Sequence, residues 1–176
     1  MPGDDVIDSA DVVMNRGFTV PGTPEEVWPW IVQLGKARGR WYLTRRLERV
    51  VPRSRRGLRH IEPRWQTLAV GDVIPDYGPD ETFTVVRIEA PRALVYYSER
   101  GRLSVTWAIT LTDSVDEMPR ARAPHGTRVR LRLRFDGVRR QWLVRTGGEL
   151  IDLLTIAGMA AGLRERLADA DFRRGH

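Results

Sequence analysis

Residues 150–167 read LIDLLTIAGMAAGLRERL and carry the longest helical pattern in the chain. Apolar and small side chains recur there at steps of three and four, which is the spacing of one face of an α-helix. Asp152 is the only charged residue before Leu163, whereas charged residues crowd the end of the stretch. We therefore expect a long C-terminal helix whose middle is buried and whose end is solvated.

Small residues interrupt the larger apolar side chains of this expected helix. They are Ala157, Gly158, Ala160, Ala161 and Gly162. Small side chains on a buried helix either allow a sheet to pack closely or leave space for another molecule. The sequence alone leaves both interpretations open.

Composition favours a single domain that is held together by packing. The chain has 176 residues, of which 41% are hydrophobic, and it contains no cysteine, which excludes disulfides and cysteine-ligated metals. The N-terminus is acidic and lacks an apolar segment, and residues 150–163 are too short and too interrupted to span a bilayer. We expect no transmembrane segment and a soluble, cytoplasmic protein.

The chain is basic, and its formal net charge of +6 comes almost entirely from arginine, because Lys36 is the only lysine. Such a balance permits contact with nucleic acids or anionic membranes, but a high arginine content can equally reflect the base composition of the genome. Arg128, Arg130, Arg132 and Arg134 alternate with apolar residues, as on the solvated face of a strand. No aromatic residue is interleaved on that side for bases to stack on, so we predict no nucleic-acid binding.

The sequence divides into a short lead-in and one domain. Residues 1–11 lack a regular pattern, so we expect a flexible lead-in, and residues 12–172 should form the domain. From Val12 to Val20 apolar residues alternate with more polar ones, which predicts a first strand, although Arg16 interrupts its apolar face.

Two short helices should follow this strand. Thr23 is a suitable N-cap, Pro24 suits the first helical turn, and Glu26 can close a capping box. The first helix should therefore begin at Pro24. The second is expected over residues 41–50, before Pro52 stops it.

From residue 70 onward the hydrophobic period changes to two, which predicts further strands separated by turns. Their ranges are 70–74, 82–88, 93–98, 103–111 and 127–135, and the loop at 113–125 has no assigned role. Short connections indicate an antiparallel meander, and each of the last two strands has a dry face for the C-terminal helix to cover. The expected fold class is α+β, with a curved antiparallel sheet of about six strands wrapped around that helix.

Motifs spread over residues 12–170 resemble, in their order along the chain, those of the START and Bet v 1 superfamily. They are TPEEVWPWIVQLG (23–35), GRWYLTRRLE (39–48), IEPRWQTLAVGDVIP (61–75), APRALVY (90–96), SVTWAITL (104–111), GTRVRLRLR (126–134) and MAAGLRERLA (159–168). The chain is most similar to the bacterial SRPBCC or polyketide cyclase/dehydrase-like branch. The resemblance implies the helix-grip fold, in which a curved sheet surrounds a long C-terminal helix.

The same resemblance implies a hollow scaffold that holds apolar or aromatic molecules between the sheet and the terminal helix. We therefore expect binding of a small hydrophobic or aromatic molecule without a cofactor; the oligomeric state is not indicated. One alternative is a polyketide cyclase/dehydratase-like enzyme acting in the same cavity, which needs a titratable group facing that cavity. Another is a partner-protein binding module, which would expose an apolar patch instead of enclosing a cavity.

Aromatic side chains with polar groups are suited to line such a cavity and to orient a flat ligand. The aromatic candidates are Trp30, Trp65, Tyr77, Tyr96 and Trp107, and on the helix side the candidates are Ile156, Ala157, Ala160 and Leu163. Packing in a solid core is the alternative for each of them.

Residues for other chemistries are few. Histidines occur only at 60, 125 and 176, too scattered for a metal site, and neither GxSxG nor a nucleotide-binding glycine motif is present. An acid or base at a cavity mouth could come from His60, Glu62, Asp72, Asp76 or Glu81. Because Asp72 follows Gly71 in a turn, a bond to backbone amides is the simpler role for it. We assign no catalytic residue and no metal ligand.

Overall fold

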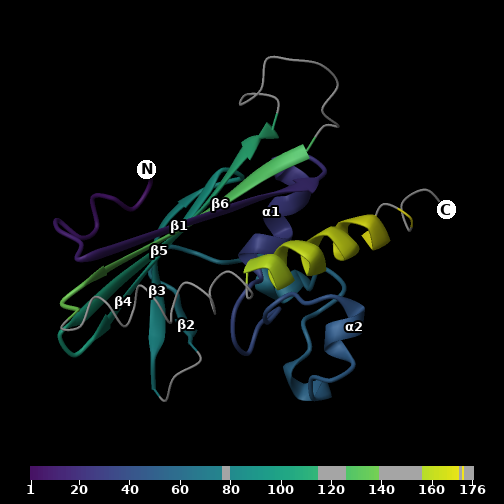
Figure 1. The fold of residues 1–176 in the computed structure, drawn as a ribbon, viewed down its shortest axis with the longest axis horizontal. Coiled ribbons are helices and arrows are strands. Elements are labelled where there is room, and N and C mark those ends of the chain that lie inside the picture. The colour runs from purple at the N-terminus through teal and green to yellow at the C-terminus, as the bar shows by residue number, and fades with distance from the viewer. Residues whose placement is uncertain (77–79, 115–125, 139–155, 171, 173–176) are drawn as a thin grey trace.

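The computed structural model describes residues 1–76, 80–114, 126–138, 156–170 and 172. This part of the chain forms one antiparallel sheet of six strands, with short helices after the first strand and a C-terminal helix over residues 156–170 (Figure 1). The strands are β1 (Val12–Pro21), β2 (Val73–Pro75), β3 (Thr82–Glu89), β4 (Ala93–Arg100), β5 (Leu103–Asp113) and β6 (Gly126–Asp136). The short helices are α1 (Pro24–Val32), α2 (Arg45–Glu48) and the 3-10 turns η1 (Arg53–Arg55) and η2 (Pro63–Trp65).

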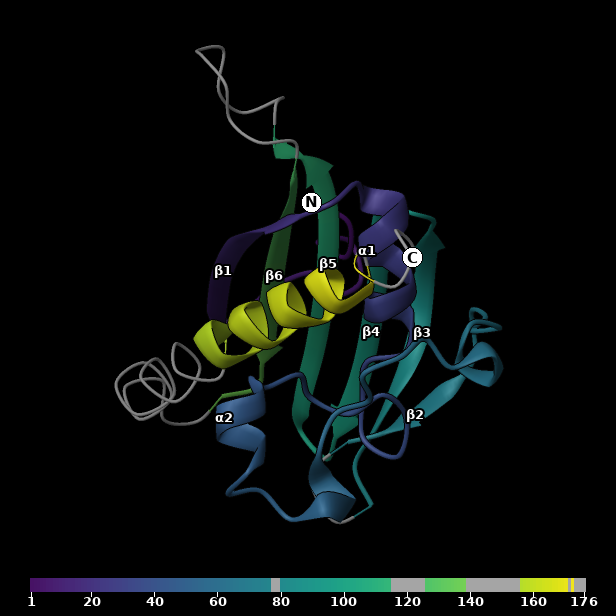
Figure 2. The same cartoon turned by 90° about the vertical axis from the view of Figure 1, so that its right-hand side faces the viewer.

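The strand order is β1-β6-β5-β4-β3-β2, so the first two strands of the chain form opposite edges of the sheet. The helices between them, together with the C-terminal helix, lie on one side of the sheet (Figures 1 and 2). In Figure 2 the C-terminal helix crosses in front of β5 and β6, beside α1. The predicted α+β helix-grip fold is confirmed.

Alternation along the strands creates the core, as expected. Ile109 and Leu111 of β5 face the same side as Val129 and Leu131 of β6, their register partners, and all are buried. Apolar residues of the C-terminal helix complete this core: Met159, Ala160, Leu163 and Leu167. Each large apolar side chain fully buried in this way contributes about 1.5–3 kcal/mol.

The predicted start of α1 is confirmed by both halves of a capping box. Thr23 Oγ1 accepts from the Glu26 amide at 3.4 Å, and Glu26 Oε2 accepts from the Thr23 amide at 3.0 Å. The predicted helix over residues 41–50 is shorter in the structure, because Thr44 caps α2 by accepting from the Leu47 amide. Tyr42 therefore enters the core before the helix begins, and its hydroxyl donates to the Trp30 carbonyl at 2.8 Å.

The strand predicted at 70–74 begins three residues later, because a turn occupies its first positions. Gly71 has a φ of 97°, in the left-handed region that favours glycine. Asp72 accepts from the Ala69 amide at 2.9 Å, which closes the turn. The backbone role expected for Asp72 is thus the one that the structure shows. Residues 150–155 of the predicted helix and residues 115–125 of the predicted loop lie outside the described residues.

Residues 1–11, the predicted lead-in, contact the sheet. Ile7 is buried, and a Cβ built on Gly3 would lie only 2.9 Å from a methyl of Val95. Asp4 pairs with Arg132 at 2.8 Å and Asp5 pairs with Arg87. Acidic residues in the lead-in therefore meet arginines on the outer face of the sheet and hold the segment there.

The arginine row of β6 is consequently not uniformly solvated. Arg130 is exposed, whereas Arg134 is buried and donates to the Asp4 carbonyl. The absence of nucleic-acid binding stays a prediction. No helix among the described residues is long and apolar enough to cross a membrane.

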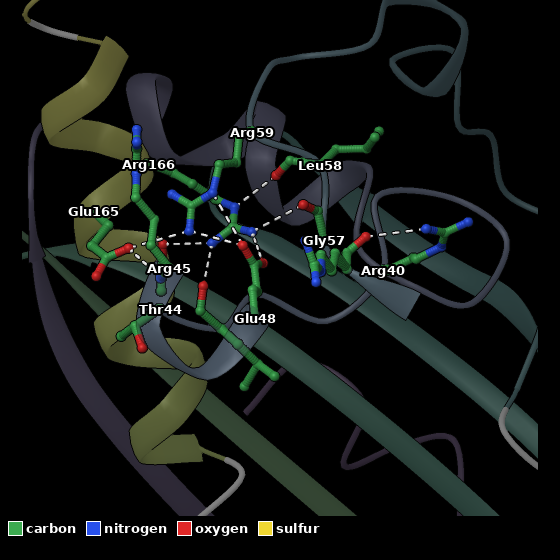
Figure 3. Close-up of polar contacts among 12 residues, drawn as sticks. Arg40, Thr44, Arg45, Glu48, Gly57, Leu58, Arg59, Glu165 and Arg166 are labelled. Atoms are coloured by element: carbon green, nitrogen blue, oxygen red, sulfur yellow. Dashed lines mark hydrogen bonds and ion pairs between the residues drawn. The ribbon is translucent and has the colours of Figure 1, made fainter. Parts of the chain in front are cut away.

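A buried arginine docks the C-terminal helix on the segment around α2 (Figure 3). Arg166 is fully buried and donates to Glu48 at 2.6 Å. Its other acceptors are the carbonyls of Leu43, Gly57, Leu58 and Gly162, at 2.6–3.2 Å. The guanidinium also lies over the Tyr42 ring, 4.6 Å from its centroid. These contacts fix which side of the helix faces α2 and which side faces the sheet.

Two of the small residues have a packing role. A Cβ built on Gly162 would lie 2.6 Å from backbone atoms of Tyr42 and Leu43, and one on Gly158 would lie 3.1 Å from the Leu43 side chain. With Arg166 they form a stripe at steps of four along the helix. Close packing, one of the two interpretations left open by the sequence, therefore explains these two glycines.

Candidate functional site

A cavity of about 540 Å³ lies between the concave face of the sheet and the segments that cover it. Much of its wall is apolar. This apolar wall includes Met14, Leu34, Ile74, Leu103, Leu131 and Leu133. The residues come from both edges and the centre of the sheet and from the segment just after α1, so the curvature of the sheet and the covering segments together create the space.

Aromatic rings form one continuous wall of the cavity. Trp107 of β5 stacks on Tyr96 of β4, its register partner, with ring centroids 5.4 Å apart and an interplanar angle of 25°. Trp41 stacks on Trp107 at 6.2 Å and 29°. Phe83 of β3 packs against Tyr96 at 6.1 Å and against Trp107 at 6.0 Å. We call Trp41, Phe83, Tyr96 and Trp107 the aromatic cluster; its rings suit a flat apolar ligand.

The Tyr96 hydroxyl is buried and has no hydrogen-bond partner among the described residues. Burial raises the pKa of Tyr96 well above its ordinary value, and the positive charge of Arg38 opposes this shift. The hydroxyl therefore stays protonated at neutral pH. It is not on the accessible surface of the cavity, so the ring rather than the hydroxyl faces the cavity.

An ion-pair cluster closes one end of the aromatic wall. Arg100, at the end of β4, donates to Asp76 at 2.5 Å and to Glu81 at 2.6 Å. Its guanidinium lies 5.1 Å from the centroid of the Phe83 ring. Among the described residues that line the cavity, Asp76 is the only carboxylate, and this ion pair holds it.

Arg16 lines the cavity from the concave face of β1. It occupies the strand between Met14 and Phe18, and its register partner on β6 is Leu131. A guanidinium thus stands in a row that is otherwise apolar. The interruption that Arg16 makes in the sequence pattern was a sign of this cavity, although no pattern assigned Arg16 to a site.

The structure brings together three of the predicted lining residues. Tyr96, Trp107 and Ile156 line the cavity. Ala160 and Leu163 are buried in the core beside it. Ala157 is exposed, because the stripe of Gly158, Gly162 and Arg166 turns it away from the sheet. Tyr77 lies outside the described residues.

Two predicted aromatic residues have structural surroundings instead. Trp30 is buried with its ring edge-on to Tyr42, 5.8 Å between centroids. Trp65 belongs to η2, and the guanidinium groups of Arg38 and Arg64 each lie over its ring, 4.8 Å from the centroid. Neither is among the described residues that line the cavity.

The other acid and base candidates do not gather at the cavity. His60 is 56% exposed and lies 3.7 Å from Glu62, and Asp72 serves the turn before β2. In the part of the chain that the structure describes, no group of three or more histidines or carboxylates is arranged to hold a metal ion.

Several lining residues were not predicted. Trp41 and Phe83 of the aromatic cluster, and Arg16, are the important ones. Trp41 lies in a segment that was expected to be helical, so its direction depended on where α2 begins. Phe83 alternates with Val85 on β3, and that alternation was the available signal.

No protein-family model and no curated protein sequence matches the chain. Solved structures do. The Mesorhizobium loti protein MLL2253 matches with a TM-score of 0.50 and 18% identity, over 88% of this chain and 98% of its own. CalU16 from Micromonospora echinospora matches with a TM-score of 0.45 and 13% identity, over 90% of this chain and 81% of its own. A Thalictrum flavum norcoclaurine synthase bound to a transition-state analogue matches with a TM-score of 0.47 and 9% identity, over 91% of this chain and 96% of its own. The chain has the helix-grip fold.

Proposed function

We propose that this protein binds a small hydrophobic or aromatic molecule in the cavity between the sheet and the C-terminal helix. The observation that carries the proposal is a cavity of about 540 Å³ walled by the aromatic cluster. Ligand sites in proteins have volumes of about 300–1,000 Å³ and mostly apolar linings. Burial of apolar ligand surface there is favourable by about 25 cal/mol per Å² before the costs of association.

The cyclase or dehydratase alternative needs an acid or base that faces the ligand. Among the described lining residues the titratable acid is Asp76, which Arg100 engages at 2.5 Å. An acid held by an arginine is poorly placed to exchange a proton with a ligand. The arrangement therefore supports binding more than it supports acid–base catalysis.

The partner-binding alternative predicted an exposed apolar patch in place of a cavity. Here the apolar residues of the concave face line a cavity. This favours a small ligand over a protein partner as the occupant of that face.

The proposal is tested with N-phenyl-1-naphthylamine, a neutral apolar probe whose fluorescence rises in dry surroundings. We expect saturable binding to the protein, and suppression by Leu133→Trp, which adds bulk at the cavity wall. Val13→Trp is the matched control, because Val13 is 42% exposed on the opposite side of β1. No saturable fluorescence, or equal suppression by both variants, would contradict the proposal.

A further inference from the structure

Arginines are concentrated in residues 45–59, which contain α2 and η1. Seven of these 15 positions are arginine, whereas lysine and arginine together number 29 in the 176 residues of the chain. The composition of the chain as a whole therefore does not account for this concentration. We call residues 45–59 the basic segment. In Figure 2, α2 and the chain that follows it lie below the C-terminal helix, at one end of the molecule.

The single carboxylate of the basic segment faces inward. Glu48 is 6% exposed, and it accepts from Arg166 at 2.6 Å and from Arg59 at 2.9 Å. On a helical turn, side chains one or two positions away from Glu48 point in other directions. Four such neighbours are exposed, namely Arg46, Leu47, Arg49 and Val50. The buried ion pair thus fixes which side of α2 is presented to solvent.

Two apolar side chains lie on this exposed side. Val50 is 85% exposed and is the most exposed large apolar side chain among the described residues, and Leu47 is 48% exposed. The Val50 amide donates to the Leu47 carbonyl at 3.2 Å. The helical turn therefore continues to Val50, and the two side chains, three positions apart, are neighbours on its surface.

Exposed arginines surround these two apolar side chains. They are Arg46 and Arg49 on the same turn as Val50, and Arg53 and Arg55 of η1. Since the only carboxylate of the segment is buried with Arg166, the exposed side of the basic segment is positive as well as partly apolar. Apolar side chains among several arginines are typical of surfaces that bind the interface of an anionic membrane.

We propose that the basic segment docks the protein on an anionic membrane surface. The arginines bind lipid phosphates, to which a guanidinium can donate two parallel hydrogen bonds. Val50 and Leu47 enter the headgroup region, where burial of apolar side chains is favourable. A single-stranded nucleic acid would be bound by aromatic side chains that stack on its bases, and the exposed apolar side chains here are aliphatic. The surface therefore fits a membrane better than a nucleic acid.

The basic segment also reaches the cavity. Arg55 lines it, and Trp41, four positions before the segment, belongs to its aromatic wall. Docking would thus hold part of the cavity wall beside the lipid surface, into which apolar molecules partition. The inference goes beyond the proposed function and does not depend on it, because exposed side chains carry it and the contents of the cavity do not enter.

Vesicles of two compositions test the docking. Binding is measured by flotation with vesicles of phosphatidylcholine alone and with vesicles that also contain about 30% phosphatidylglycerol, an anionic lipid. We expect at least about tenfold tighter binding to the anionic vesicles. Because salt screens exposed charges, most of this binding should be lost between about 0.1 M and about 0.5 M NaCl.

Charge variants locate the binding surface. Each arginine at an anionic membrane contributes about fivefold to binding, so the double variant Arg46→Gln with Arg49→Gln should weaken binding at least about tenfold. Arg130→Glu is the control, because it lowers the net charge by the same two units at an exposed position on β6. It should change binding less than about twofold.

The absence of cysteine from the chain allows a single label to report insertion. Val50→Cys carrying the dye NBD, whose fluorescence rises in apolar surroundings, should brighten on addition of the anionic vesicles. Val13→Cys with the same dye is the control, because Val13 is 42% exposed on β1, and its fluorescence should not change.

Three results would each overturn the docking: equal binding to the two kinds of vesicle, equal loss in the double variant and in Arg130→Glu, or no brightening at position 50. Binding of a short RNA or DNA in place of the vesicles would also overturn it. Each of these results leaves the proposed cavity ligand standing. Should the double variant fail to fold, the lipid preference of the unchanged protein and the Val50 label decide the question.

Discussion

Arg166 of the C-terminal helix and Glu48 of α2, 118 positions apart in the chain, form a buried ion pair with Nη2 2.6 Å from Oε1. Glu48 also accepts from Arg59, at 2.9 Å and 3.1 Å. The pair thus joins the helix that covers the sheet to the segment that carries Trp41 into the cavity wall (Figure 3).

Replacing this arginine should strongly destabilise the protein. Arg166→Met leaves the Glu48 carboxylate with Arg59 alone and removes the donors of several buried carbonyls. Loss of one partner of a buried pair costs about 3–5 kcal/mol, measured here as the free energy of unfolding in urea. Arg45→Met is the control, because Arg45 is 61% exposed in its pair with Asp169, and it should cause little change. Similar losses in both variants would argue against a special role for the buried pair.

Gly162 should not tolerate even a methyl group. Gly162→Ala places a Cβ 2.6 Å from the Tyr42 and Leu43 backbone, and neither backbone segment can move without disturbing the Arg166 contacts. Although alanine is the better helix former, we expect a net loss of at least about 1 kcal/mol from overpacking. Ala168→Gly, at an exposed position of the same helix, reports the propensity effect alone. A thermal melt in which Gly162→Ala is as stable as the parent would show that the close approach is unimportant.

These contacts explain how far the sequence could predict the fold. Local patterns were sufficient where one element decides its own structure: the Thr23 and Glu26 capping box is present, and the dry faces of β5 and β6 face the core. Helical spacing also identified the C-terminal helix. Spacing gives a broad apolar face, however, and not the direction in which that face points. Arg166 and Gly162 set that direction, so Ala157 became exposed while Ala160 became buried.

The candidate site was predictable in part for the same reason. Tyr96 and Trp107 were identified as aromatic residues with polar groups on predicted strands, and they are register partners. The position of Trp41 depends on where Thr44 ends the extended segment before α2. The position of Trp65 depends on its ring contacts with two arginines. Such contacts join distant parts of the chain and leave no periodic pattern.

The capping box makes a local prediction. Thr23→Ala removes the acceptor of the Glu26 amide and should lower the free energy of unfolding by about 1 kcal/mol. Thr67→Ala changes an exposed threonine outside the regular elements and serves as the control. If chemical denaturation gave the same midpoint for Thr23→Ala and the parent, the cap would make no measurable contribution to stability.

Two tryptophan substitutions in the C-terminal helix can test where the solid core ends and the cavity begins. Ala160 is 4% exposed within the core cluster, so Ala160→Trp should overpack the core and cost about 1–3 kcal/mol or more. Ile156, one turn earlier, lines the cavity, so Ile156→Trp has space to enter. We expect Ile156→Trp to melt near the parent temperature while suppressing binding of N-phenyl-1-naphthylamine. The reverse pattern, with Ala160→Trp tolerated and Ile156→Trp destabilised, would mean that the empty space lies beside Ala160 and not beside Ile156. The contrast between the two variants is informative because both add the same side chain to the same helix, and they differ in what that side chain meets.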